Sequence, residues 1–216
     1  ARLIRMGESV VICEQNEEPG KGKVKLFTRK ISRIITPGTA TDDGIAPDRE
    51  DNLIACVCRG KAYYGLAALS LGSGRFTTTI AATGREVRLF LDRASPAEVV
   101  CPEEFEEGDL FEGISSRKRI PAWNFEPATC YRLLCSQFGT QSLFGFGVED
   151  LEDGICAAGA LLAYVKTTQS GPMAHVRSLR RDDSGSCVLL DRTAQRNLEL
   201  FENLRGGSEG TLVSVL

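Results

Sequence analysis

The chain has 216 residues, of which 42% are hydrophobic and 25% charged, a balance typical of a globular protein with one large or two small domains. No apolar run approaches the roughly 20 residues that cross a bilayer, which excludes a membrane-spanning helix in the sequence. The formal net charge is −3, yet residues 1–36 hold eight Lys or Arg and only four Glu. This basic segment predicts either an anionic partner or a solvated strand edge protected by lysines.

The first fifty residues predict a short helix followed by two strands. The segment "ARLIRMG" is typical of the last turns of a helix that ends at Gly7. The apolar "SVVICEQ" predicts one strand, and the β-branched, basic "VKLFTRKISRIIT" predicts a second. The segment "PGTATDDGIAPDRED" is rich in Pro, Gly and Asp, which predicts a linker and a domain boundary.

The middle of the chain predicts an α/β domain with a mixed sheet, because several strands are followed by helices. We expect strands in "NLIACVCRG", "AYYGLAALSLG", "RFTTTIA", "PAEVVCP" and "KRIPAWNF". We expect helices in "REVRLFLDRA", "PATCYRLLCSQFG" and "VEDLEDGICAAGALLAYVKTTQ", and a loop or short helix in "EEFEEGDLFEG". Glu149 and Asp150 are predicted at the positive end of the last helix, with Lys166 near its negative end.

The last forty residues predict a hairpin and a helix. The segment "VRSLRRDDSGSCVLLD" is typical of a hairpin that turns at Asp183, Ser184 and Gly185. A helix is expected from about Thr193 to Leu204, ended by two glycines. The following apolar stretch stops at Leu216 partway through an element, so we expect the chain to be an internal part of a longer protein.

The sequence predicts no catalytic residue and no metal site. No stretch matches the phosphate-binding G-x-x-x-x-G-K-[ST] pattern. Most of the eight cysteines lie in apolar runs, and Cys56 with Cys58 is the only tight pair, so we expect reduced, structural cysteines in a cytosolic protein. The dense acids of residues 103–107 are expected to be solvated. A small enzyme that uses a cysteine and His175, the only histidine, is a further hypothesis at this point.

Three stretches of the sequence resemble the MutS family of bacterial DNA mismatch repair proteins, in the order and spacing of that family. They are "MGESVVICEQ" with "RKISRIITPGTATDD", "LSLGSGRF" with "QFGTQSLFGFGVED" and "GICAAGALLAYVKTTQ", and "HVRSLRRDD" with "LLDRTAQRNLELFENLRGGSEGTLVSVL". The resemblance implies that residues 1–46 are the end of an α/β mismatch-recognition domain and its linker. It implies an RNase H-like connector domain over residues 47–170 and the start of a mainly helical core, or lever, domain over residues 171–216.

The resemblance also implies a role in DNA mismatch repair. The full-length family is a homodimer that binds mismatched DNA, is an ATPase that uses ATP and Mg²⁺, and recruits the partner MutL. Neither the mismatch-reading Phe-x-Glu motif nor the ATPase site maps onto this sequence, so we expect no enzymatic activity and no cofactor in this segment. We expect a cytoplasmic, nucleoid-associated protein without membrane contact. The basic residues expected to support the DNA backbone are Lys23, Lys25, Arg29, Lys30 and Arg33.

Two further expectations concern the connector. Arg132, on the predicted helix of residues 127–138, is the candidate for docking MutL, whereas Tyr131, Leu134 and Phe138 are expected to pack that helix on the sheet. Ala158 and Gly159 lie in a run of small residues that predicts a tight helix contact within the link between domains.

A nuclease of the RNase H-like fold needs carboxylates on its first strand to hold two metal ions, and "LIACVC" has none. The fold is therefore expected to serve as a scaffold. The alternative hypothesis is a free-standing nucleic-acid-binding or scaffold module of the same fold, without nuclease activity.

Overall fold

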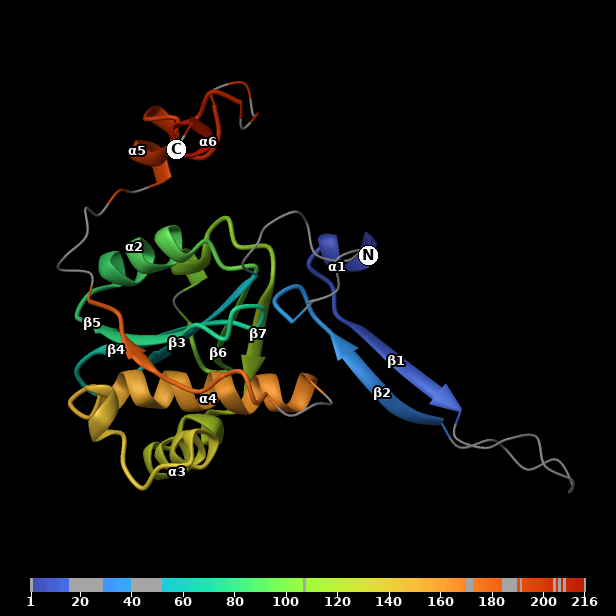
Figure 1. Cartoon of the computed structure of the whole chain (residues 1–216), viewed down its shortest axis with the longest axis vertical. Helices are drawn as coiled ribbons and strands as arrows, with labels where there is room; N and C mark the ends of the chain where they lie inside the picture. The colour runs from blue at the N-terminus through green and yellow to red at the C-terminus, as the bar shows by residue number, and fades with distance from the viewer. Residues whose placement is uncertain are drawn as a thin grey trace, which may run out of the picture.

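The computed structural model describes residues 2–15, 29–39, 52–106, 108–169, 173–183, 190, 192–203, 205, 207 and 209–215 (Figure 1). Several sequence expectations lie outside these residues. They concern Lys23, Lys25, the linker from residue 40 to residue 51, the hairpin turn at residues 184–185, and Leu204.

An antiparallel ribbon begins the chain. A short helix, α1 (Arg2–Arg5), precedes the two strands β1 (Val10–Gln15) and β2 (Arg29–Ile35), and Figure 1 shows them projecting beside the main domain. Val10 pairs with Ile35 at the inner end of the ribbon, where Ile4 and Ile35 are buried together. Because a two-stranded ribbon is marginally stable alone, this small cluster and the contacts beyond Ile35 must hold it.

A six-stranded mixed sheet forms the centre of the main domain, as the sequence predicts. Its strands are β3 (Leu53–Arg59), β4 (Tyr64–Ser70), β5 (Phe76–Ala81), β6 (Glu98–Pro102), β7 (Arg117–Ile120) and β8 (Arg180–Arg181). The strand order is β7-β6-β3-β4-β5-β8. Strand β4 is antiparallel to both of its neighbours, β3 and β5. Strand β6 is parallel to β3, β7 is parallel to β6, and β8 is parallel to β5.

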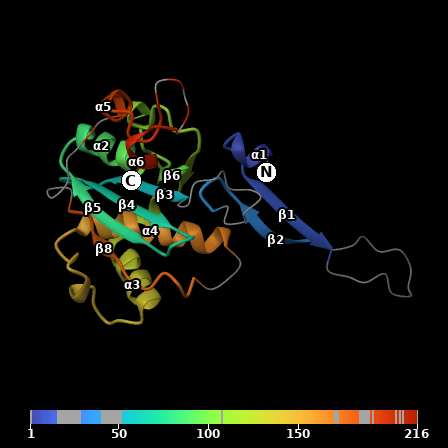
Figure 2. The same ribbon diagram turned by 45° about the horizontal axis from the view of Figure 1, so that its top comes forward.

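Helices cover both faces of this sheet (Figures 1 and 2). Helix α2 (Gly84–Ala94) covers one face, and α4 (Glu152–Thr168) covers the other, with α3 (Pro127–Phe138) outside it. Along β3 the side chains alternate between these cores, since Cys56 joins the α4 side and Ala55 and Val57 join the α2 side. A strand buried on both faces reads as the continuous apolar run seen in the sequence.

The remaining elements are short. Three 3₁₀ helices, η1 (Gly108–Phe111), η2 (Ala122–Phe125) and η3 (Phe144–Phe146), lie in the connections. The helices α5 (Arg192–Asn197) and α6 (Leu212–Val215) follow the sheet. No helix in the described part of the chain is both long and apolar enough to cross a membrane.

Three expected elements differ from the structure in their bounds. The strand expected in "KRIPAWNF" ends at Ile120, and the 3₁₀ helix η2 follows it. Helix α4 begins at Glu152, so Glu149 and Asp150 precede it, and Glu152 and Asp153 occupy its positive end. Helix α5 ends at Asn197, well before the predicted end, and Glu199 just after it has a left-handed φ of 47°.

Strand β8 lies beyond the predicted domain boundary at residue 170. Arg180 and Arg181 pair with Thr77 and Thr78 of β5, in the segment that the sequence predicted to be one half of a hairpin. The Asp182 N–H also donates to the carbonyl of Thr78 at 2.9 Å. The sheet therefore draws its last strand from residues that the sequence assigned to the next domain.

Candidate nucleic-acid interface and domain junction

The predicted DNA-contacting residues that the structure describes all lie on β2. Arg29 and Lys30 are exposed and Arg33 is half-buried. Residues paired across two strands point to the same face, and β2 has one extra residue, Ser32, at the register shift opposite Ile12 and Cys13. Lys30 and Arg33 therefore share one face of the ribbon, and Arg29 lies on the other. Lys30 also stands directly opposite Glu14 in the register. The structure thus gathers two of these cations on one face and separates the third, whereas Lys23 and Lys25 lie outside the described residues.

The ribbon runs into a buried turn formed by residues 36–39. The N–H of Thr36 donates to the Thr39 hydroxyl at 2.9 Å, and the N–H of Thr39 donates to the carbonyl of Thr36 at 3.1 Å. A Cβ on Gly38 would lie 2.4 Å from Cγ1 of Ile54, so only glycine lets this turn approach β3. The turn is therefore packed directly on the sheet of the main domain.

A fully buried carboxylate, that of Glu98, receives this turn. Its Oε2 accepts hydrogen bonds from the Thr36 hydroxyl at 2.5 Å and from the Gly38 N–H at 3.0 Å. Its Oε1 accepts one from the Tyr164 hydroxyl at 2.6 Å. Burial, and after it the neighbouring Glu98, raise the pKa of Tyr164, which keeps this hydroxyl protonated and able to donate. One side chain of β6 thereby connects the end of the ribbon with α4.

Two amide side chains extend the same junction. The Gln169 side chain, just after α4, donates to the carbonyl of Thr39 at 3.0 Å. The Asn52 side chain, just before β3, donates to the carbonyl of Pro37 at 3.4 Å. Sequence analysis missed this junction, although Glu98 stands as a single acid inside the apolar "PAEVVCP". A charged residue in a strand that is expected to be buried was the available signal, because a buried charge needs partners.

The surface around α3 is exposed and carries two aromatic side chains that sequence analysis did not single out. Arg132 is exposed, and its Nε donates to the carbonyl of Ala128 at 3.2 Å. Trp123 in η2 is 74% exposed and Phe144 in η3 is 79% exposed. These aromatics occur on the short segments before and after α3, where no periodic pattern distinguishes surface from core.

Helix α3 packs closely against α4 where the sequence has its small residues. Ala158 is fully buried, and a Cβ on Gly159 would lie 2.3 Å from the Cβ of Cys130. The close approach therefore joins two helices of the same domain. Leu134 is fully buried in this core, and Tyr131 and Phe138 pack against it. The expectation that they pack the helix on the sheet is wrong in one respect, because α4 lies between α3 and the sheet (Figure 1).

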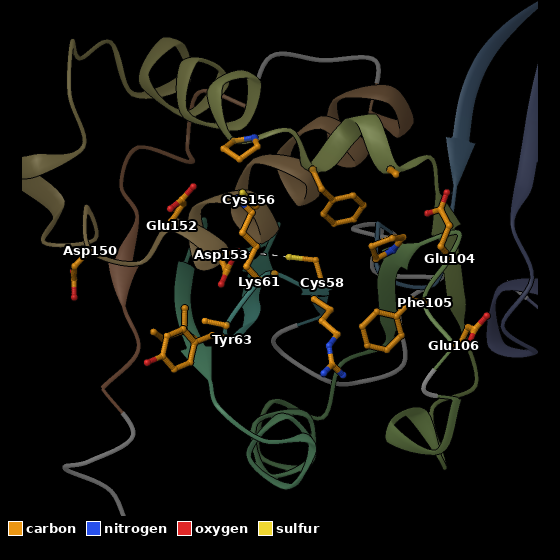
Figure 3. A pocket seen from close by; sticks show the side chains of 18 residues that line it. Cys58, Lys61, Tyr63, Glu104, Phe105, Glu106, Asp150, Glu152, Asp153 and Cys156 are labelled. Atoms are coloured by element: carbon orange, nitrogen blue, oxygen red, sulfur yellow. Dashed lines mark hydrogen bonds between the residues drawn. The ribbon is translucent and has the colours of Figure 1, made fainter.

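A cleft of about 1020 Å³ opens at the carboxyl ends of β3, β6 and β7 (Figure 3). The acids that line it are Glu104, Glu106, Asp150, Glu152 and Asp153. Within the described ranges, however, no three His, Cys, Asp or Glu side chains are grouped so that they could hold a metal ion. The cleft has the position of a ligand site in an α/β sheet but lacks a cluster of metal ligands.

Of the two thiols that line this cleft, those of Cys58 and Cys156, the first is poorly suited to nucleophilic chemistry. Burial raises the pKa of Cys58, whose thiol donates to the carbonyl of Asp153 at 3.6 Å. A thiol with a raised pKa is protonated at neutral pH and is a weak nucleophile. His175 is exposed next to Gly74 in the turn between β4 and β5, and it does not line the cleft. The hypothesis of a cysteine and histidine enzyme gains no geometric support from these residues.

The fold and the junction define a multidomain protein in which a mixed α/β domain carries a basic antiparallel ribbon on a buried joint. Comparison with known families agrees with this division. The model of MutS domain I matches residues 1–44, and the model of MutS domain II matches residues 52–177, which is more than half of the chain. The chain belongs to the MutS family of DNA mismatch repair proteins.

Proposed function

We propose that these residues support mismatched duplex DNA through the ribbon and relay its position through the α/β domain to the rest of a longer, dimeric protein. The observation that carries this proposal is the buried joint between Thr36, Gly38 and Glu98, which connects a basic ribbon with a domain of large hydrophobic core. Arg29, which is exposed on β2 and paired with the neutral Gln15, is the cation best placed for phosphate. Phosphate contacts of this kind position a protein on DNA without reading its sequence.

The α/β domain acts in this proposal as a scaffold of RNase H-like fold. Support comes from the antiparallel meander of β3, β4 and β5, which is followed by the parallel strands β6 and β7 on the other side of β3. Strand β3 has no acid along its length, so the carboxylate pair needed for metal-dependent cleavage has no place on it. The proposal includes no step through ATP or Mg²⁺ bound to these residues, because the sequence has no phosphate-binding loop.

The surface of α3 is the proposed docking site for MutL in the bacterial cytoplasm. Arg132 is exposed there, and Trp123 and Phe144 supply exposed apolar area on the segments that flank the helix. Interfaces are enriched in aromatic side chains and arginine, which favours this surface. Weaker binding of MutL by Arg132→Glu, with normal binding by Lys166→Glu on α4, would support the site. Equal binding by both variants would contradict it.

The salt dependence of DNA binding tests the contact made by the ribbon. Each phosphate contact that is lost lowers the slope of log K against log salt concentration by about 0.9. We expect Arg29→Gln to lower this slope for a mismatched duplex, measured by fluorescence anisotropy with the 216-residue chain. The matched control is Lys30→Gln, on the opposite face and across from Glu14, and it should leave the slope unchanged. Equal slopes for all three proteins would contradict the proposed contact.

A further inference from the structure

We infer that Glu98 is a positioning residue, which holds the DNA-facing ribbon at a fixed orientation to the α/β domain. The buried carboxylate of Glu98 accepts three hydrogen bonds, and their donors belong to two other parts of the chain. Thr36 and Gly38 belong to the end of the ribbon, and Tyr164 belongs to α4. Glu98 itself begins β6, so the carboxylate is the point at which these three segments meet.

The cost of leaving a carboxylate unpaired makes this joint stiff. Glu98 is fully buried, and a buried charge is tolerated only while its hydrogen bonds are made. Any rotation of the ribbon that separates Thr36 from Oε2 leaves that oxygen without two of its donors. Gly38 restricts the turn further, because its backbone lies against Ile54 with no room for a Cβ. The ribbon can therefore move relative to the sheet only by breaking the whole junction.

A second approach of this segment to the α/β domain lies before β1, where a Cβ on Gly7 would be 3.0 Å from the carbonyl oxygen of Ser115. Within the described residues the ribbon's own apolar cluster consists of Ile4 and Ile35, with Val10 packed against them. That cluster holds the two strands and α1 together. Because the turn that Glu98 binds continues β2 directly, the orientation of Arg29, at the outer end of β2, depends on that turn.

Two substitutions of Glu98 separate hydrogen bonding from charge. Glu98→Ala removes both oxygens and leaves the Thr36 hydroxyl and the Gly38 N–H without their acceptor. Glu98→Gln retains one oxygen for those two donors and offers an NH₂ group to the Tyr164 hydroxyl, which can accept as well as donate. We expect Glu98→Gln to rescue the orientation that Glu98→Ala loses.

The orientation is measured as a distance between two spin labels on the full 216-residue chain. One label is placed on Cys13, which is exposed on β1, and the other on Ser136→Cys, at an exposed position of α3. Cys187→Ser removes a thiol that lies outside the described residues, and the other cysteines of the described part are buried. The labelled reference protein and Glu98→Gln should each give one narrow distance distribution. Glu98→Ala should instead give a broad distribution of the distance between the two labels.

Thr78→Val is the matched control for a general loss of stability. The Thr78 hydroxyl is fully buried and donates within the α/β domain, to the carbonyls of Leu66 and Gly154. Its removal should lower the Tm and leave the distance narrow. A broad distribution in Thr78→Val, or a narrow one in folded Glu98→Ala, would overturn the inference. If circular dichroism shows Glu98→Ala to be unfolded, Thr36→Val decides instead, and a narrow distribution in that variant overturns it.

The expected effect of these variants on DNA binding rests on the proposed function, whereas the distance measurement is independent of it. If the ribbon contacts DNA, the variants with a broad distribution should bind a mismatched duplex more weakly than Glu98→Gln does. A broad distribution together with unchanged duplex binding would support the joint and contradict the proposed DNA contact.

Discussion

Two glycines determine how closely segments of this protein approach one another. Gly38 lets the turn after the ribbon lie on Ile54, and Gly159 lets α4 lie on Cys130 of α3. Glycine inside a helix costs about 1 kcal/mol relative to alanine, so its presence at position 159 needs a packing reason. The 2.3 Å separation between a Cβ at that position and the Cβ of Cys130 supplies this reason.

Gly159→Ala should therefore destabilise the protein in spite of its better helix propensity. Overpacking of a core costs about 1–3 kcal/mol, and the gain in propensity is about 1 kcal/mol, so we expect a net loss of up to about 2 kcal/mol. Urea unfolding measures this loss, which should be larger for Gly159→Leu. The control is Gly145→Ala in η3, where a Cβ meets nothing within 4 Å. Equal stability of the two alanine variants would refute the packing role of Gly159.

Helix α3 begins on an unusual cap, because its first N–H groups are bound by a glutamate. The Glu126 side chain accepts from the N–H of Ala128 at 3.2 Å and from the N–H of Thr129 at 2.6 Å. Hydrogen bonds from Thr129, those of its side chain first and its backbone next, lower the pKa of Glu126 below its ordinary value. The carboxylate form is therefore the one that stabilises this end of the helix.

The contribution of this cap should depend on pH. A carboxylate with a lowered pKa stabilises the fold above the pKa of the unfolded chain, about 4.3 for glutamate, and loses that contribution as pH falls through its folded pKa. Glu126→Ala should thus have a lower Tm than the parent protein at pH 7, and the difference should disappear at strongly acid pH. Glu112→Ala, at another exposed acid, is the control. A Tm difference for Glu126→Ala that is independent of pH would rule out capping by the charged form.

The helices and strands that are determined by neighbouring residues in the sequence were predictable. Alternating and continuous apolar runs indicated β3, β4 and β5, and the Pro127 start and Gly139 stop fixed α3, whose end has a left-handed φ of 67° at that glycine. Strand β8 has only two residues, and its pairing depends on Thr77 and Thr78, about a hundred residues earlier in the chain. No local pattern marks such a strand.

The candidate site was predictable only in part, for the same physical reason. The run of basic residues placed Arg29, Lys30 and Arg33 on one strand, but their division between two faces follows from the observed pairing of β1 with β2. The partners of Glu98 are separated from it by 62 residues at Thr36 and by 66 at Tyr164. Contacts at this separation depend on the tertiary fold, so the sequence alone pointed only to an acid in a buried strand.

At the scale of the whole molecule, the chain divides into a ribbon that can face DNA and an α/β domain that can transmit its position. The joint at Glu98 makes these parts depend on each other. The close packing of α4 against both the sheet and α3 makes the domain behave as one body.

The most direct measurement is the spontaneous mutation rate of a bacterial strain that lacks its own MutS. In that strain, residues 1–216 replace the matching segment of a working MutS. We expect this chimera to restore a low mutation rate, and we expect the chimera carrying Glu98→Ala to restore it less than the one carrying Glu98→Gln. A rate that stays high, with the chimera folded and abundant, would contradict a role of these residues in mismatch repair.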